Sequence, residues 1–162
     1  MKTIILFSTT YGCTKACADK LASQINGEVS VVNVMTDPIA SIAAFDNIVL
    51  GGSIYMGQLQ KKLKTFCTEN INVLLKKRIA LFLCCGLSEN FEQSMHNAFP
   101  EQLLNRAVAK ECFGGELHTS KMNLVHKMLT GMMTKVAAKE KKPPASLQPE
   151  NIAKLAKIIN GE

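Results

Sequence analysis

The stretch Lys2-Thr-Ile-Ile-Leu-Phe-Ser-Thr-Thr-Tyr-Gly-Cys-Thr14 begins as a short apolar run and ends as a small polar loop. A helical pattern follows, with apolar residues at positions 17, 18, 21 and 25 on one face and Gly27 placed as a C-terminal stop. The loop therefore joins a predicted strand to a predicted helix. This strand–loop–helix unit decides the fold class and points to the first candidate site.

The loop offers hydroxyl groups, one glycine and the N–H groups of a helix N-terminus, which together can cradle a phosphate. It has no Arg or Lys before Lys15, so binding would depend mainly on neutral donors. The alternative interpretation is a helix N-cap in a Ser/Thr-rich turn. The candidate phosphate-binding residues are Ser8, Thr9, Thr10, Tyr11, Gly12, Cys13 and Thr14.

The rest of the chain repeats the alternation of strand with helix. Further apolar runs occupy residues 29–34, 47–51, 79–85 and the region near 111–117, and helical patterns occupy residues 58–70, 91–104 and 149–160. We expect Pro100 to break the second of these helical patterns. Strands that are apolar throughout are typical of a parallel sheet with helices on both faces. We therefore predict a single doubly wound α/β domain over residues 1–162, with its ligand beyond the carboxyl ends of the strands.

Composition narrows the function classes. The chain has 162 residues, 47% of them hydrophobic, and a net charge of +6. No apolar run approaches the roughly 20 residues needed to span a bilayer, and the start lacks a signal-peptide pattern, so we expect a soluble, cytoplasmic protein. Six cysteines in such a chain indicate free thiols, and their spacing predicts no metal site. We also expect no nucleic-acid partner.

Several other classes of nucleotide-binding or phosphate-handling protein are excluded because their motifs are missing. Neither the dinucleotide fingerprint G-x-G-x-x-G nor the triphosphate loop G-x-x-x-x-G-K-[ST] occurs. A low-molecular-weight phosphatase would need an Arg six residues after Cys13, where Asp19 stands. A response-regulator receiver would need acidic residues after the first strand and at the end of the third, where this chain has hydroxyls and glycines.

The opening stretch resembles the first strand and the S-T-x-x-G-x-T phosphate loop of flavodoxin-like FMN-binding domains. The segment Leu50-Gly-Gly-Ser-Ile-Tyr-Met-Gly57 is similar to the G-[AG]-S-I-x-x-G loop that follows their third strand. Within that family, the chain looks most like the menaquinone-dependent, oxygen-independent protoporphyrinogen oxidases. The resemblance extends from residue 2 to about residue 160, and it implies a flavodoxin-like five-stranded parallel sheet in the order 2-1-3-4-5.

The resemblance also implies FMN as the cofactor and assigns the remaining site residues. The segment that would lie against the isoalloxazine ring is Ser53, Ile54, Tyr55, Met56 and Gly57. The oxidases commonly have an aromatic residue where this chain has Met56. Topology suggests the loop after the fourth strand, beginning with Cys85 and Gly86, as the second wall of the ring site.

Almost all of the excess charge lies in one segment. Residues 118–145 contain six lysines against one glutamate, together with four of the eight methionines. Apolar residues recur there at helical spacing, which predicts a basic amphipathic helix inserted before the last helix. One interpretation is peripheral contact with an anionic membrane surface, and the other is a helix packed on the sheet edge with a solvated lysine face.

We therefore predict an FMN-dependent oxidoreductase resembling the quinone-dependent protoporphyrinogen oxidases, with a quinone or a redox protein as electron partner. The alternatives are a flavodoxin-type electron-transfer protein without its own substrate and a flavin-free interaction domain. Flavodoxins are usually acidic, so the charge of +6 fits the carrier role less well. No side chain is assigned as a catalytic acid or base, because His96, His118 and His126 qualify only by residue type. The sequence makes no prediction of the oligomeric state.

Overall fold

The computed structural model describes residues 1–54, 57–85, 90–115, 131 and 146–162. Their strands form one five-stranded parallel sheet in the order β2-β1-β3-β4-β5, which confirms the predicted topology. The strands are β1 (Lys2–Ser8), β2 (Glu28–Asn33), β3 (Asn47–Ser53), β4 (Arg78–Cys84) and β5 (Ala109–Cys112).

The central strands form because their side chains are apolar on both faces. In β1, every residue from Thr3 to Ser8 is buried, and Ile5 pairs with Val31 of β2 and Val49 of β3. The edge strand β2 is only half-buried. This burial on both faces requires helices on both sides of the sheet.

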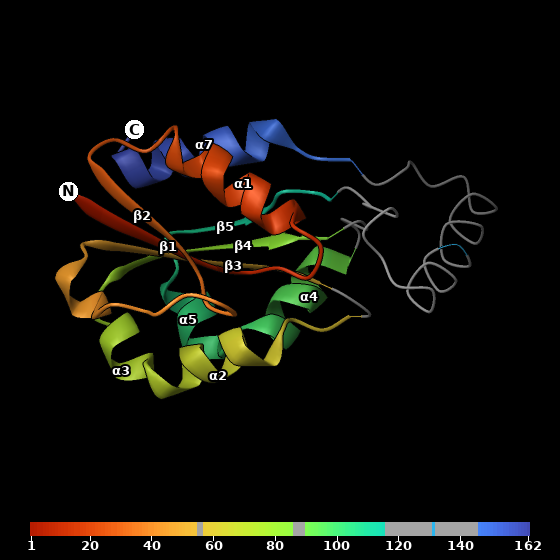
Figure 1. The fold of residues 1–162 in the computed structure, drawn as a ribbon, viewed down its shortest axis with the longest axis horizontal. Coiled ribbons are helices and arrows are strands. Elements are labelled where there is room, and N and C mark those ends of the chain that lie inside the picture. Colours follow the sequence, from red (N-terminus) through yellow and green to blue (C-terminus); the bar gives the residue numbers. More distant parts are fainter. Residues whose placement is uncertain (55–56, 86–89, 116–130, 132–145) are drawn as a thin grey trace.

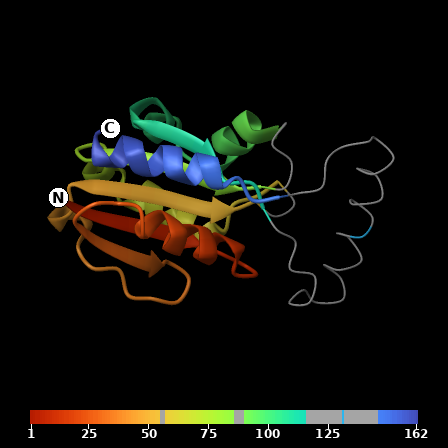
Figure 2. The same cartoon turned by 90° about the horizontal axis from the view of Figure 1, so that it is seen from above.

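The helices cover the two faces as predicted (Figures 1 and 2). Helices α1 and α7 lie on one face, and α2, α3, α4 and α5 lie on the other. Their bounds are α1 (Cys13–Ala22), α2 (Lys61–Glu69), α3 (Ile71–Leu74), α4 (Phe91–Ala98), α5 (Glu101–Arg106) and α7 (Pro149–Asn160), with a 3-10 turn η1 (Ile42–Ala44).

Each face of the sheet has its own apolar core. Beneath α1 and α7, Phe82 of β4 stacks on Phe113 with ring centroids 4.4 Å apart. A methyl group at Gly51 would lie 2.0 Å from the Phe82 ring, so the glycine in β3 provides the space for this stack. The sequence Gly51-Gly52 is therefore part of the scaffold that holds the third loop.

Element boundaries differ from the sequence predictions by a residue or two at several strands, and more clearly in three places. Helix α1 ends at Ala22, and Gly27 (φ 92°) instead forms the turn into β2, where a Cβ would lie 2.5 Å from the Met1 carbonyl oxygen. The predicted helix over residues 58–70 begins at Lys61. Strand β5 starts earlier than expected because Val108 N–H already donates to the Ile79 carbonyl.

Candidate functional site at the carboxyl edge of the sheet

The first loop turns sharply into α1 at a glycine. Gly12 has φ 94°, a left-handed conformation that other residues adopt only at a cost. Its N–H donates to Thr9 Oγ1 at 2.9 Å, and the first helical bond runs from Ala16 N–H to the Gly12 carbonyl. The loop therefore presents the N-terminus of α1 beside the carboxyl ends of the strands, as the sequence predicted. We call this side of the sheet its carboxyl edge.

Thr14 carries the clearest indication that this loop can bind a ligand. Its side chain is fully buried in the first turn of α1, and Oγ1 has no hydrogen-bond partner. In the part of the chain that the structure describes, it is the one buried side-chain nitrogen or oxygen in that condition. Leaving a buried hydroxyl unsatisfied costs about 1–3 kcal/mol. A phosphate oxygen at the helix N-terminus would satisfy it, so these residues fit an FMN phosphate.

Gln60 joins the first and third loops. Ser8 Oγ donates to Gln60 Oε1 at 2.6 Å, while Gln60 Nε2 donates to Thr10 Oγ1 at 2.9 Å and to Ser53 Oγ at 2.8 Å. These three hydroxyls follow or end the two central strands, so one amide fixes both loops at the same edge. Gln60 was not predicted as a site residue, because the helical pattern over residues 58–70 placed it inside a helix. In the structure it precedes Lys61, the first residue of α2.

Gly52 makes this hydrogen-bond network possible. A methyl group at this position would lie 2.3 Å from Leu59 Cδ1 and 2.8 Å from Ser8 Oγ. The absence of a side chain lets Ser8 and Gln60 approach each other across β3. The glycine therefore serves the contact between loops.

The third loop continues from β3 with a fixed backbone. Ile54 N–H donates to the Cys84 carbonyl at 3.0 Å, which extends the pairing with β4 past Ser53. Gly57 is exposed and has φ 74°. Ser53, Ile54 and Gly57 thus follow the same carboxyl edge as the first loop, whereas Tyr55 and Met56 lie outside the described residues.

Cys85 follows β4, but its thiol faces β5. Its Sγ lies 3.1 Å from Cys112 Sγ, and both side chains are buried. The hydrogen bond between the thiols raises the pKa of Cys85 and lowers that of Cys112. Gly86 lies outside the described residues, so the second wall of the ring site stays a prediction.

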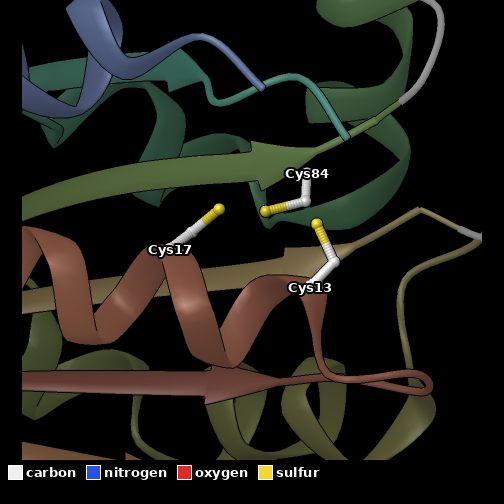
Figure 3. A group of neighbouring side chains, drawn as sticks. All are labelled: Cys13, Cys17 and Cys84. Carbon is white, nitrogen blue, oxygen red and sulfur yellow. The ribbon is translucent and has the colours of Figure 1, made fainter. Parts of the chain in front are cut away.

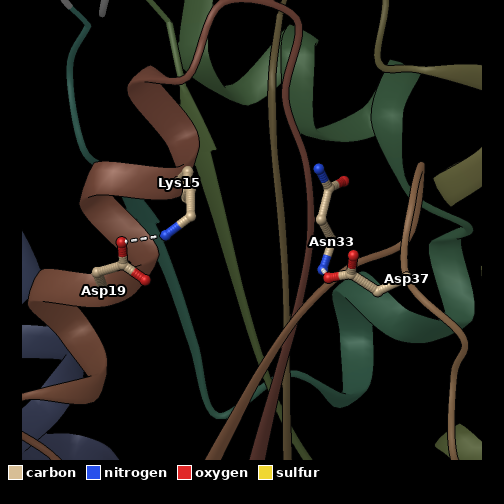
Figure 4. Close-up of polar contacts among 4 residues, drawn as sticks. All are labelled: Lys15, Asp19, Asn33 and Asp37. Atoms are coloured by element: carbon tan, nitrogen blue, oxygen red, sulfur yellow. Dashed lines mark hydrogen bonds and ion pairs between the residues drawn. The ribbon is translucent and has the colours of Figure 1, made fainter.

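Charges next to the first loop are already compensated (Figure 4). Lys15 Nζ lies 2.6 Å from Asp19 Oδ2, one helical turn away. Asp37 accepts hydrogen bonds from Asn33 N–H at 2.9 Å and Thr36 Oγ1 at 2.8 Å; these bonds, with a smaller contribution from Lys15, lower the pKa of Asp37. Phosphate binding here would therefore depend mainly on neutral donors.

The surface also has a hollow at the opposite end of the molecule, near the amino ends of the strands. Its volume is about 330 Å³, and its lining includes Gln24 and Asn26 after α1 and Lys157 and Asn160 near the end of α7. This hollow shares no residue with the loops that follow β1, β3 and β4. We assign the candidate site to the carboxyl edge because Thr14 and the paired loops lie there.

The predicted basic helix over residues 118–145 lies outside the described residues, apart from Gly131. Among the helices that are described, none has both the length and the apolar character needed to cross a bilayer.

Comparison with known proteins supports the fold. The model of the flavodoxin domain matches residues 4–143 of this chain. No curated protein sequence matches the chain significantly.

Solved structures with the same fold share little sequence with the chain. A flavodoxin from the domain Archaea is 15% identical, with a TM-score of 0.51 and coverage of 98% of this chain and 99% of that one. Two-electron reduced Megasphaera elsdenii flavodoxin is 16% identical, with a TM-score of 0.52 and coverage of 68% and 84%. Rubredoxin oxygen:oxidoreductase from Desulfovibrio gigas is 10% identical, with a TM-score of 0.55, and the match covers 99% of this chain but only 37% of that one.

The flavodoxin-domain match and the observed topology confirm two of the sequence predictions, the flavodoxin-like fold and FMN as the cofactor. The more specific resemblance to protoporphyrinogen oxidases receives no support from these comparisons.

Proposed function

Because the chain belongs to the flavodoxin family, we propose that it is an FMN-dependent oxidoreductase that holds the cofactor at the carboxyl edge of its sheet. The observation that carries this proposal is the buried, unpartnered Thr14 hydroxyl in the first turn of α1. Bound FMN supplies the capacity to accept and release electrons. The chain itself supplies binding and orientation.

The phosphate end would be held by the first loop. Thr14 Oγ1 and the N–H groups of the first turn of α1 would donate to phosphate oxygens, and the helix dipole would favour the negative charge. Gly12 sets the direction of these donors through its left-handed backbone. Ser8, Thr9 and Thr10 brace the loop through the hydrogen bonds described above.

The ring end would lie against the third loop. Gln60 holds Ser53 beside the first loop, and the Ile54 N–H is fixed on the Cys84 carbonyl. A ring in this position needs an apolar surface and backbone groups for its heteroatoms, which residues 53–57 offer by composition.

Reconstitution with FMN tests the site. Thr14→Val removes the hydroxyl while keeping the β-branched shape, and we expect FMN affinity to fall about ten- to a hundredfold, the equivalent of one hydrogen bond to a charged group. Thr68→Val is the matched control, because Thr68 is an exposed residue of α2 whose hydroxyl donates to the Lys64 carbonyl. If both variants bind FMN as tightly as the wild type, Thr14 does not hydrogen-bond to the FMN phosphate and the proposal is wrong.

The specific reaction is proposed on the sequence resemblance. We infer oxidation of a porphyrinogen with a quinone as acceptor, because both loop motifs resemble those of the menaquinone-dependent protoporphyrinogen oxidases. Reduction of the bound flavin by protoporphyrinogen, followed by turnover when a menaquinone analogue is added, is the expected result. Rapid electron exchange with redox proteins but no reduction by protoporphyrinogen would favour the alternative, a flavodoxin-type carrier.

The charge of residues 118–145 supports contact with an anionic membrane surface, where the quinone would be found. Each lysine near such a surface contributes about 1 kcal/mol. We expect the wild type to co-sediment with anionic liposomes and a variant with the segment's six lysines changed to Gln to stay in the supernatant. Equal sedimentation of the two proteins would rule out this contact.

A further inference from the structure

Three cysteines come together beneath the start of α1. The Sγ atoms of Cys13, Cys17 and Cys84 all lie within 4.8 Å of one another. Figure 3 shows the three thiols directed at one another, two from α1 and one from the end of β4. We propose that they form a site for one soft, thiophilic metal ion, and that Cu(I) is the ion that suits it best.

The backbone explains why the three thiols meet. Cys13 and Cys17 stand four residues apart in α1, so their side chains lie one above the other on the same helix face. That face packs on the sheet, where Cys84 is the last residue of β4. The sequence predicted no metal site because spacing along the chain does not reveal that Cys84 lies beside α1.

The sulfur positions suit a three-coordinate ion. Three thiolates around an ion at metal–sulfur distances of about 2.3 Å lie about 4 Å from one another. The observed limit of 4.8 Å is close to this arrangement, so binding would require shifts of less than about 1 Å. In the described part of the chain, no histidine or carboxylate joins the group. A set of sulfur donors alone selects soft ions such as Cu(I).

The surroundings favour an ion that is held away from solvent. Cys17 and Cys84 are 1% and 3% exposed, and they belong to the apolar core beneath α1. Cys13 is only half-buried, which provides a path for the ion from the loop edge. Binding replaces thiol protons by metal–sulfur bonds and releases these protons to water, without any change of oxidation state.

Anaerobic titration of the FMN-loaded protein with Cu(I), in competition with a colorimetric Cu(I) chelator, tests the proposal. We expect one equivalent to bind, with three sulfur ligands seen by X-ray absorption. Cys17→Ser should lower the affinity at least tenfold, whereas Cys67→Ser, which changes a buried thiol on α2 outside the cluster, should leave it unchanged.

Cys13→Ser is the second variant, because its half-buried side chain makes misfolding less of a concern. It too should weaken Cu(I) binding at least tenfold. Wild-type affinity in both Cys13→Ser and Cys17→Ser would overturn the proposal. So would loss of the ion in Cys112→Ser while these two variants retain it, since that result would assign binding to the Cys85–Cys112 pair. Because Cu(I) binding is measured directly, neither result bears on the proposed electron-transfer function.

Discussion

Polar groups at the amino ends of the strands (the amino edge) and at their carboxyl ends (the carboxyl edge) differ in whether all of them have hydrogen-bond partners. At the amino edge, Lys2 N–H donates to Asp46 Oδ2 at 2.7 Å, and Asn160 bonds through both ends of its amide to Asn26 N–H and the Gln24 carbonyl. At the carboxyl edge, the loops are also braced, yet Thr14 Oγ1 is left buried without a partner. The hydrogen bonds at the amino edge therefore stabilise the fold, whereas the carboxyl edge keeps a donor that a ligand could use.

This contrast separates stability from function. Substitutions at the amino edge should lower the free energy of unfolding and leave FMN binding intact. Substitutions at the carboxyl edge should affect both quantities, or FMN binding alone.

The largest effect is expected at Gly51, which supports the carboxyl edge from within the sheet. Gly51→Ala places a methyl group 2.0 Å from the stacked Phe82 ring, and we expect the free energy of unfolding to fall by about 3 kcal/mol. Chemical denaturation measures the loss. In a Phe82→Leu background the same change should cost clearly less, because the ring is gone; an unchanged cost would show that the strain lies elsewhere.

Gln60→Leu should weaken both properties of the carboxyl edge. It leaves the fully buried Ser8 hydroxyl without its acceptor, which costs about 1–3 kcal/mol of stability. It also frees Thr10 and Ser53, so FMN affinity should fall about tenfold or more, measured by fluorescence titration. The control is Gln93→Leu, which changes an exposed glutamine of α4, and a loss of equal size in this control would contradict the role of Gln60.

Asn160→Ala tests the amino edge. Loss of its two hydrogen bonds, to Asn26 N–H and the Gln24 carbonyl, should lower stability by about 1–2 kcal/mol. FMN affinity should stay within twofold of the wild type. A large drop in FMN affinity would mean that the two edges are not independent.

Cys67 belongs to neither edge and provides a reference. Burial raises its pKa to about 12, from an ordinary value of 9.0. A raised pKa contributes stability that is fully present below pH 9 and is lost as the pH rises towards 12. Cys67→Ala should cost about 1 kcal/mol at pH 8 through its small cavity, and this cost should shrink by about 1 kcal/mol at pH 10. A pH-independent cost would contradict the raised pKa.

The fold could be predicted because its signals are local in the sequence. Apolar runs gave the strands, Pro100 separates α4 from α5, and Pro149 and Gly161 bound α7 as expected. Gly27 was assigned the wrong role, since a glycine that ends a helix and one that turns into a strand both adopt a positive φ. The sequence alone could not tell these two turns apart.

The site was only partly predictable, because its contacts connect distant parts of the chain. The phosphate loop around Gly12 and Thr14 follows from one continuous motif. Two residues could not be found in this way: Gln60, which was also placed inside a helix, and Cys84, the proposed metal ligand. Both depend on partners that the order of the strands brings together. A motif places residues along the chain, whereas the sheet decides which loops meet.

The most direct test of the account is to locate FMN on the protein itself. Backbone amide chemical shifts of the ¹⁵N-labelled apoprotein, followed during titration with FMN, report where the cofactor binds. The largest chemical-shift changes should fall on residues 8–14 and 53–57, with the amide of Thr14 among the most strongly shifted. Changes concentrated instead around Asn26 and Asn160, at the hollow beside the amino edge, would contradict a flavin site at the carboxyl edge.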